Sequence, residues 1–318
     1  MKGFLLGSAA VGIPAIANAL VAQRSPRLEA PTWGRTRRYA WKLGEISYQL
    51  LGEGDPIVLL HSFGPGHDSE EWRSVAEILA QDHRVYAVDL LGWGLSQRPG
   101  ITYDGELYIE LVHDFLTDVV EEGATIAAVG LPAAYAVQVA VDHPDLVTAL
   151  ALVTPSGIDI DGDEPDLKDA LLYGLLRLPI IGTSALNIYT SRTAIQQHLR
   201  HEIHAAPERV DGALIEHHHR SSHQPGSHSA LAAYLCGYLN HRVEDVLRRL
   251  KVPLWIAWGS HATTPSIEAA DLWIRQLPET ELEVFREAGN LPHEERAAHF
   301  CSRLGRFLTA RSSAPTPL

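Results

Sequence analysis

The sequence has few cysteines and few basic residues. Its 318 residues include only two cysteines, Cys236 and Cys301, which match no disulfide framework or metal-ligand spacing. We therefore expect buried thiols in a reducing compartment. Lys and Arg number 26 against 39 Asp and Glu, and this net charge of -13 argues against a nucleic-acid partner, which requires a basic face. With 46% hydrophobic and 20% charged residues, the composition suits one folded domain with a large core.

Charged residues are also absent from residues 3–22, GFLLGSAAVGIPAIANALVA. As a helix, this run is just long enough to cross a hydrocarbon core of about 30 Å. Three interpretations compete: a transmembrane anchor, a cleaved signal peptide, and a helix of the globular domain. Several arginines follow the run and only Lys2 precedes it. This bias favours an anchor over residues 1–23 that crosses the cytoplasmic (inner) membrane once, with the soluble domain facing the cytoplasm.

The rest of the chain follows an α/β pattern. Residues 24–36 contain prolines and are expected to be a linker. Apolar strand-like runs then alternate with helical patterns, which predicts a mostly parallel sheet with helices on both faces. Residues 156–250 carry no strand pattern, so we expect a helical insertion between core segments 37–155 and 251–310. The last residues, 311–318, are expected to form a disordered tail.

Five short motifs, in order along the chain, resemble those of the α/β-hydrolase fold superfamily. They are His61-Ser62-Phe63-Gly64, similar to the His-Gly oxyanion loop; Asp89–Ser96, similar to D-x-x-G-x-G-x-S; His143–Val147, similar to His-Pro-Glu-x-Val; Trp258-Gly259, at the end of the strand that usually carries the acid; and Gly289–Glu294, similar to the loop that carries the histidine. The resemblance covers roughly residues 37 to 310. It implies that the block 156–250 is the cap domain of that family.

The resemblance also locates the three positions of the catalytic triad. Active members place a serine on a sharp strand-to-helix turn and take an acid and a histidine from later loops. The corresponding positions here are Gly130 (Pro132 in a gapped register), Ala262 and Asn290. Residues 126–134 contain no Ser, Thr, Cys, Asp or Glu, so neither register supplies a nucleophile. An acid placed after the preceding strand would be Asp159, which comes slightly late. We therefore expect a degenerate triad with no catalytic residue.

A residual pocket is expected where these loops meet. Its expected lining is His61, Ser62, Phe63, Leu131, Ser260, His261 and His293. New Ser62–His61 or Ser260–His261 pairs are conceivable replacements for the triad, although adjacent residues rarely point their side chains at one another. His293 is expected to begin or cap the last helix.

Nine of the 17 histidines fall within the expected cap. They are His198, His201, His204, His217, His218, His219, His223, His228 and His241. The sequence has no H-E-x-x-H motif, and no carboxylate lies at ligand spacing within residues 217–228. We therefore favour an exposed polar helix and loop, and expect no metal and no cofactor. Metal or pigment ligation and a pH-sensitive contact surface remain alternatives.

These observations favour a non-catalytic protein, a pseudoenzyme held at the cytoplasmic membrane face through residues 3–22. It would serve as an accessory subunit or as a docking or ligand-binding scaffold, with a protein partner in or at the membrane. Two alternatives remain. One is an active esterase or lipase-type hydrolase that uses displaced residues, and the other is a lyase or cofactor-free enzyme on the same scaffold.

Overall fold

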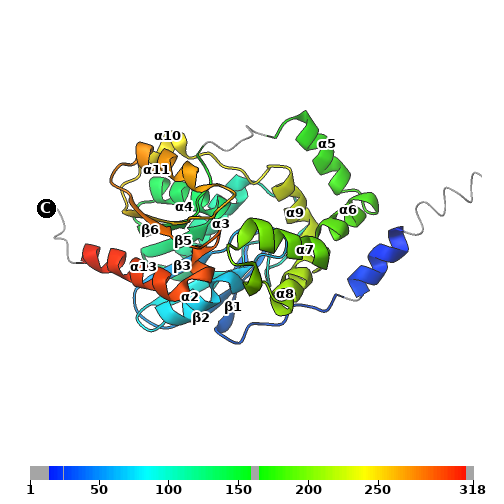
Figure 1. Cartoon of the computed structure of the whole chain (residues 1–318), viewed down its shortest axis with the longest axis horizontal. Coiled ribbons are helices and arrows are strands. Elements are labelled where there is room, and N and C mark those ends of the chain that lie inside the picture. Colours follow the sequence, from blue (N-terminus) through cyan, green and yellow to red (C-terminus); the bar gives the residue numbers. More distant parts are fainter. Residues whose placement is uncertain (1–13, 24, 159–164, 313–318) are drawn as a thin grey trace, which may run out of the picture.

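A single eight-stranded sheet forms the centre of the protein. The computed structural model describes residues 14–23, 25–158 and 165–312. Within them the strand order is β1-β2-β4-β3-β5-β6-β7-β8 (Figure 1). The strands are β1 Arg35–Trp41, β2 Gly44–Leu51, β3 Pro56–Leu60, β4 Arg84–Val88, β5 Ala124–Val129, β6 Val147–Val153, β7 Leu254–Gly259 and β8 Glu281–Phe285. β2 pairs antiparallel with β1 and β4, and the other five pairings are parallel. The predicted mostly parallel sheet is thus confirmed.

Helices of the core connect these strands. They are η1 Ser69–Trp72, α2 Arg73–Leu79, α3 Gly105–Phe115, η2 Leu116–Val120, α4 Leu131–Asp142, η5 Ile267–Ala269, α11 Ala270–Gln276, α12 Pro292–Glu295 and α13 Ala297–Ser312. Strand β3 is fully buried, because its alternate side chains meet helices on both faces. Ile57 and Leu59 belong to the apolar cluster that α2 and α13 cover, and Val58 and Leu60 belong to the one that α3 and α4 cover.

The inserted block forms a helical cap, as the sequence predicts. Its helices are α5 Leu167–Leu176, α6 Ile181–Tyr189, α7 Arg192–His198, η3 Leu199–Ile203, η4 Pro207–Arg209, α8 Gly212–Ser222, α9 Ser227–Leu235 and α10 Glu244–Leu247. Local capping fixes where several of them begin. At the start of α8, for example, the Asp211 carboxylate accepts a hydrogen bond from the Leu214 N–H at 2.8 Å. Residues of this block and of the loops that follow β3, β5, β6, β7 and β8 line one cavity, so the cap lies over the carboxyl ends of these strands.

Residues 14–23 form a helix that contacts the cap. The Asn18 side chain donates to the carbonyl of Ile180 at 3.1 Å and accepts from the Ser184 hydroxyl at 3.2 Å. Residues 3–13 of the expected anchor lie outside the described residues. Among the helices that the structure does describe, none is by itself both long and apolar enough to cross a bilayer.

Two expected boundaries are corrected. Strand β1 begins at Arg35, inside the expected linker 24–36, because Arg35 already pairs with Leu50 of β2. Helix α13 extends to Ser312, into the expected tail 311–318, and residues 313–318 lie outside the described part of the chain. Its apolar face packs on the core as far as Leu308, and the helix continues from there to Ser312.

Candidate functional site

The turn between β5 and α4 is the first feature of the site. Gly130 forms it with φ 62° and ψ −125°, and its N–H donates to the Val153 carbonyl of β6 at 3.1 Å. Residues other than glycine rarely adopt this positive φ. A Cβ atom added to Gly130 would meet no other atom within 4 Å. The chain therefore forms the sharp strand-to-helix turn with open space where a nucleophilic side chain would stand.

Asn290 connects the two loops that would carry the other triad residues. It follows β8, and its side-chain oxygen accepts from the Thr263 N–H at 2.9 Å while its amide nitrogen donates to the Thr264 carbonyl at 2.5 Å. Ala262, one residue earlier in that loop, is buried. An amide holds loops together in this way but does not transfer a proton near neutral pH.

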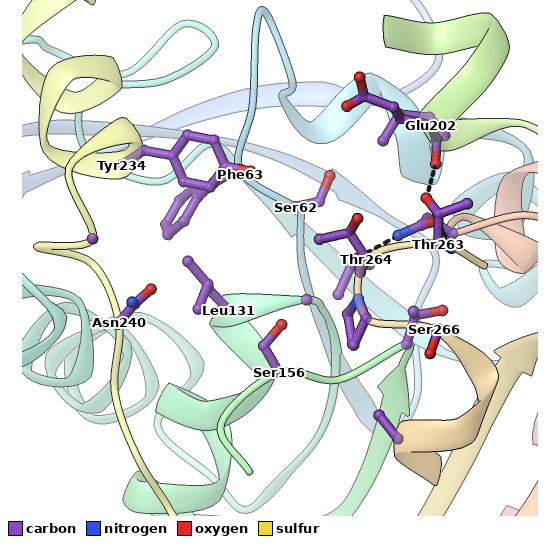
Figure 2. Close-up of a pocket in the computed structure, with 18 of the residues that line it drawn as sticks. Ser62, Phe63, Leu131, Ser156, Glu202, Tyr234, Asn240, Thr263, Thr264 and Ser266 are labelled. Atoms are coloured by element: carbon purple, nitrogen blue, oxygen red, sulfur yellow. Dashed lines mark hydrogen bonds between the residues drawn. The ribbon is translucent and has the colours of Figure 1, made fainter. Parts of the chain in front are cut away.

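A cavity of about 1130 Å³ lies between these loops and the cap. Figure 2 shows its mixed lining, with Phe63, Leu131 and Tyr234 on one side and threonine and serine side chains on the other. Gly130 and Asn290 also line it. Of the seven expected pocket residues, Ser62, Phe63 and Leu131 line the cavity. The expected lining is corrected for the other four, because His61, Ser260, His261 and His293 are not among the residues that line it.

Next to the cavity lies a buried polar group, the Ser62–His67–Glu71 cluster. The Ser62 hydroxyl donates to a Glu71 carboxylate oxygen at 2.7 Å and lies 2.8 Å from Nδ1 of His67. The other Glu71 oxygen accepts from the Ser62 backbone N–H at 2.8 Å. His67 Nδ1 lies 3.2 Å from Glu71. The carboxylate therefore joins the loop after β3 to the start of helix η1.

The conceivable Ser62–His61 pair is not formed. His61 Nδ1 bonds to the Ser62 backbone carbonyl at 2.7 Å, and its Nε2 accepts from the Leu90 N–H at 3.1 Å. Both ring nitrogens thus serve the backbone of neighbouring loops, and the Ser62 hydroxyl turns to the other partners. The Ser260 hydroxyl does lie 3.1 Å from Nδ1 of His261, but this pair is exposed.

Burial controls the charges in and around the cluster. It raises the pKa of Glu71 and lowers the pKa of His67 well below its usual value. His293, the second residue of α12, is fully buried 3.7 Å from Glu71, and its ring packs at a tilt against Trp72. Burial lowers its pKa to about 4, so its ring is neutral near pH 7.

The cap histidines are not the exposed surface that the sequence favoured. His218 and His219 are buried, and His218 Nδ1 bonds to the Pro65 carbonyl at 2.8 Å. Gly66 permits this close approach, since a Cβ there would lie 2.0 Å from the His218 carbonyl oxygen. The cause of the burial is that α8 packs directly on the loop after β3. In the described residues no cluster of three or more His, Cys, Asp or Glu has a geometry that could hold a metal.

His217 forms an ion pair across this contact. Its Nε2 lies 2.9 Å from one Asp68 oxygen and 3.0 Å from the other. The charge of Asp68 raises the pKa of His217 to about 9. Burial opposes ionisation of Asp68, but His217 outweighs it and holds the pKa of Asp68 below its usual value. Both groups are therefore charged at neutral pH and join the cap to the core.

Sequence reasoning missed the part that Glu71 plays. Glu71 begins no recognisable motif, and its partners are Ser62 and His67 in the loop after β3 and the distant His293 on α12. The one feature of the sequence that could have indicated this cluster was the position of His67 in the loop after β3. Asp159, the late candidate for the acid, lies outside the described residues.

Comparison with known proteins agrees with this architecture. The model of the alpha/beta hydrolase family matches residues 57–303. Over 135 residues the chain is 36% identical to the 2-hydroxy-6-oxo-6-(2'-aminophenyl)hexa-2,4-dienoic acid hydrolase of Metapseudomonas resinovorans, covering 42% of this chain and 46% of that one. It thus spans less than half the length of this relative. Over 271 residues it is 25% identical to the 2-hydroxymuconate semialdehyde hydrolase of a Pseudomonas species, covering 83% and 90%.

Two solved structures share the fold. A serine hydrolase involved in carbazole degradation has a TM-score of 0.71 at 21% identity, covering 87% of this chain and 99% of the other. A bacterial membrane phospholipase A also has a TM-score of 0.71 at 21% identity, covering 99% and 100%. With the family match extending from β3 to α13, this chain belongs to the alpha/beta hydrolase family.

Proposed function

We propose that this chain is a non-catalytic member of its family, a pseudoenzyme that acts as a ligand-binding or docking scaffold of a membrane complex. The observation that carries the proposal is Gly130 at the sharp turn after β5, with open space above it. A hydrolase of this fold needs a nucleophile there. In a well-studied triad, removal of the catalytic residues costs on the order of 10⁶ in turnover.

The positions of the acid and the histidine of the triad support the same proposal. Ala262 has no ionisable group, and the Asn290 amide is held by the backbone of Thr263 and Thr264. Active members use a histidine at such a position because its pKa near neutrality lets it take the serine proton and return it. Three positions on three separate loops thus lack the groups needed for acyl transfer.

The cavity gives the scaffold a ligand-binding site. Leu131 is the first residue of α4, and backbone N–H groups at a helix start have no partner inside the helix. In hydrolases of this fold the N–H of the residue after the nucleophile, here Leu131, and an N–H from the loop after β3 bind a carbonyl oxygen. The apolar side chains beside them favour a ligand with a carbonyl or carboxylate group on an apolar body.

The membrane location rests on the N-terminal residues. The uncharged run 3–22 and the arginines that follow it favour a single span with the domain in the cytoplasm. Asn18 bonds to α6, so the same segment that would enter the membrane also contacts the cap. A protein partner in or at the membrane is part of the proposal.

Probe labelling tests the absence of catalysis. The full chain in detergent is treated with a fluorophosphonate probe and with a panel of short-chain nitrophenyl esters. We expect no labelling and no turnover above a heat-denatured control. The triple variant Gly130→Ser/Ala262→Asp/Asn290→His serves as a comparison that restores the three groups. Labelling of a serine in the unaltered protein would overturn the proposal.

A hydrolase that uses Ser62 is the second candidate. The observation that favours it is the Ser62 hydroxyl, which lines the cavity and lies 2.8 Å from His67. Against it, the same hydroxyl donates to Glu71, whose carboxylate also accepts the Ser62 N–H. Labelling that disappears in both Ser62→Ala and His67→Ala would establish this candidate.

Co-purification tests the scaffold role. The full chain is extracted from native membranes with mild detergent and isolated by a C-terminal tag. A protein present in stoichiometric amounts is the expected result. A chain that extracts without a partner would overturn the subunit role but not the ligand-binding role. Titration of the protein with apolar carboxylates then tests whether the cavity binds a ligand.

A further inference from the structure

The outer end of the cap exposes an unusual number of large aliphatic side chains. Among the described residues, all but two of the well-exposed large hydrophobic side chains lie on α5, on α6, on the turn between them or on the helix 14–23. We call these the cap-end patch; its members are Ile16, Leu20, Leu167, Leu171, Leu172, Leu175, Leu178, Ile181, Ile188 and Tyr189. Leu171 is 68% exposed and Ile188 is 72% exposed. Soluble monomers rarely expose so many apolar side chains together, because each leaves apolar surface in contact with water.

The sequence of this region is as apolar as its surface. From Ala170 to Thr190, Arg177 is the only charged residue. The segment therefore carries none of the acidic residues that give the whole chain its net charge of -13. Helices α5 and α6 together meet the length and apolarity of a membrane span, but they are bent by 95° to each other. A pair bent in this way does not cross a bilayer as one rod, whereas both helices can lie along its surface.

The N-terminal helix provides the argument for what covers this patch. Residues 14–23 end an uncharged run that begins at residue 3, and Asn18 binds them to α6. Figure 1 shows this helix, α5 and α6 at one end of the molecule, with α13 at the other. A membrane reached by the uncharged run therefore lies against α5 and α6.

We propose that the cap-end patch lies on the lipid bilayer, with the aliphatic side chains of α5 and α6 inserted at the boundary between headgroups and acyl chains. Arg177 then lies at headgroup level, where an anionic phosphate attracts it. This inference rests on the membrane location of the proposed function and names the surface that meets the lipid. The same two helices contribute Asp169 and Tyr189 to the wall of the cavity, which places the cavity beside the bilayer.

Environment-sensitive probes test this surface in the full chain. Leu171→Cys and Ile188→Cys are labelled with a nitrobenzoxadiazole (NBD) dye on the patch. Leu43→Cys and Val284→Cys are the matched controls. Leu43 and Val284 are also large, apolar residues, 40% and 42% exposed, but they lie at the β1–β2 turn and on β8, outside the patch. The native Cys236 and Cys301 are buried and remain unlabelled in the folded protein. The labelled chains are reconstituted into phosphatidylcholine–phosphatidylglycerol vesicles, with and without lipids that carry a nitroxide in the acyl chain.

We expect the patch probes to be quenched by the nitroxide lipid about twofold or more, and the control probes to be unaffected. Equal quenching at the patch and control sites would overturn the proposal. A blue shift of the patch probes in vesicles without quenching by the nitroxide lipid would also overturn it. If that shift grows with protein concentration, a second copy covers the patch; if it is independent of concentration, the chain covers the patch itself.

A different measurement tests the transmembrane anchor. Release of the unaltered protein from vesicles by alkaline carbonate would overturn the span over residues 3–22. The ratio of quenching between patch and control probes decides separately whether the cap-end patch lies on the lipid. As a second check, Leu171→Asp/Ile188→Asp is compared with Leu43→Asp/Val284→Asp by protease protection of α5 in vesicles. Loss of protection in the first variant alone is the expected result, and equal protection in both would contradict the proposal.

Discussion

Two loops at the same edge of the sheet differ in what they retain. The turn after β5 has the backbone of a nucleophile position, with Gly130 at φ 62°, but no reactive side chain. The loop after β3 has a serine and a histidine in hydrogen-bond contact with a carboxylate of helix η1, but these groups are buried and the cap lies over them. One loop has the geometry of catalysis, and the other has residues of the kind that catalysis uses.

The difference shows that geometry and chemistry persist for separate physical reasons. The turn is retained because β5 must lead into α4, and glycine takes the required dihedral angles without steric cost. The Ser62–His67–Glu71 cluster persists because a buried carboxylate must be hydrogen-bonded. Neither loop is by itself proof of an activity, and each is open to a direct test.

Removal of the Glu71 carboxylate has the largest expected effect. In Glu71→Ala, the Ser62 N–H, the Ser62 hydroxyl and His67 lose a buried acceptor. We expect the free energy of unfolding to fall by about 3 kcal/mol, because the groups left behind are buried without a partner. Urea unfolding followed by circular dichroism measures this.

Glu77→Ala is the matched control for that change. Glu77 lies on the adjoining helix and pairs with Arg73 at the surface, so we expect a loss of at most about 0.5 kcal/mol. If Glu71→Ala proved as stable as Glu77→Ala, the structural interpretation of the cluster would fail. A simultaneous loss of ester turnover would then favour the catalytic one.

The Asp68–His217 pair joins the cap to the same loop, and its contribution depends on pH. The pKa of His217 is raised to about 9 from 6.5, so its contribution is complete below about pH 6.5 and is lost as the pH rises through 9. We expect Asp68→Asn to lower the free energy of unfolding by about 2 kcal/mol at pH 6.

A double-mutant cycle with His217→Gln isolates the pair. Asp68 also accepts from the Glu70 N–H, so the single variant includes a loss that is independent of pH. The coupling energy should be present at pH 6 and absent at pH 10. A coupling of the same size at both values would show that the contact is not an ion pair.

The sequence predicted those features that depend on residues close together in the chain. The sheet and the turn at Gly130 were predictable, because short motifs stand at or after the ends of β3, β4, β7 and β8 and a glycine occupies the strained turn. The burial of His218 and the partners of Glu71 were not, because they arise where α8 packs on the loop after β3. That contact joins residues about 150 positions apart and leaves no periodic signal in either segment.

Gly130→Ala tests the turn without adding a functional group. The added Cβ meets no atom within 4 Å, so the expected cost comes from the backbone alone. A residue with a side chain at this positive φ loses about 1–2 kcal/mol of stability. Thermal unfolding measures the change.

Gly305→Ala provides the contrast. A Cβ there also meets no atom within 4 Å, but Gly305 lies inside helix α13 and has no positive φ. Alanine should therefore stabilise the protein by up to about 1 kcal/mol. If both variants shifted the unfolding temperature in the same direction, the strain assigned to the turn would be refuted.

The exposed pair of Ser260 and His261 has the smallest expected effect. The Ser260 hydroxyl lies 3.1 Å from His261 and accepts from the Glu287 N–H at 3.1 Å, both at the surface. Water replaces such contacts, so Ser260→Ala should change the free energy of unfolding by less than about 0.5 kcal/mol. Probe labelling and ester turnover should equal those of the unaltered chain. Any ester turnover lost in Ser260→Ala would instead place a reactive centre in the loop after β7.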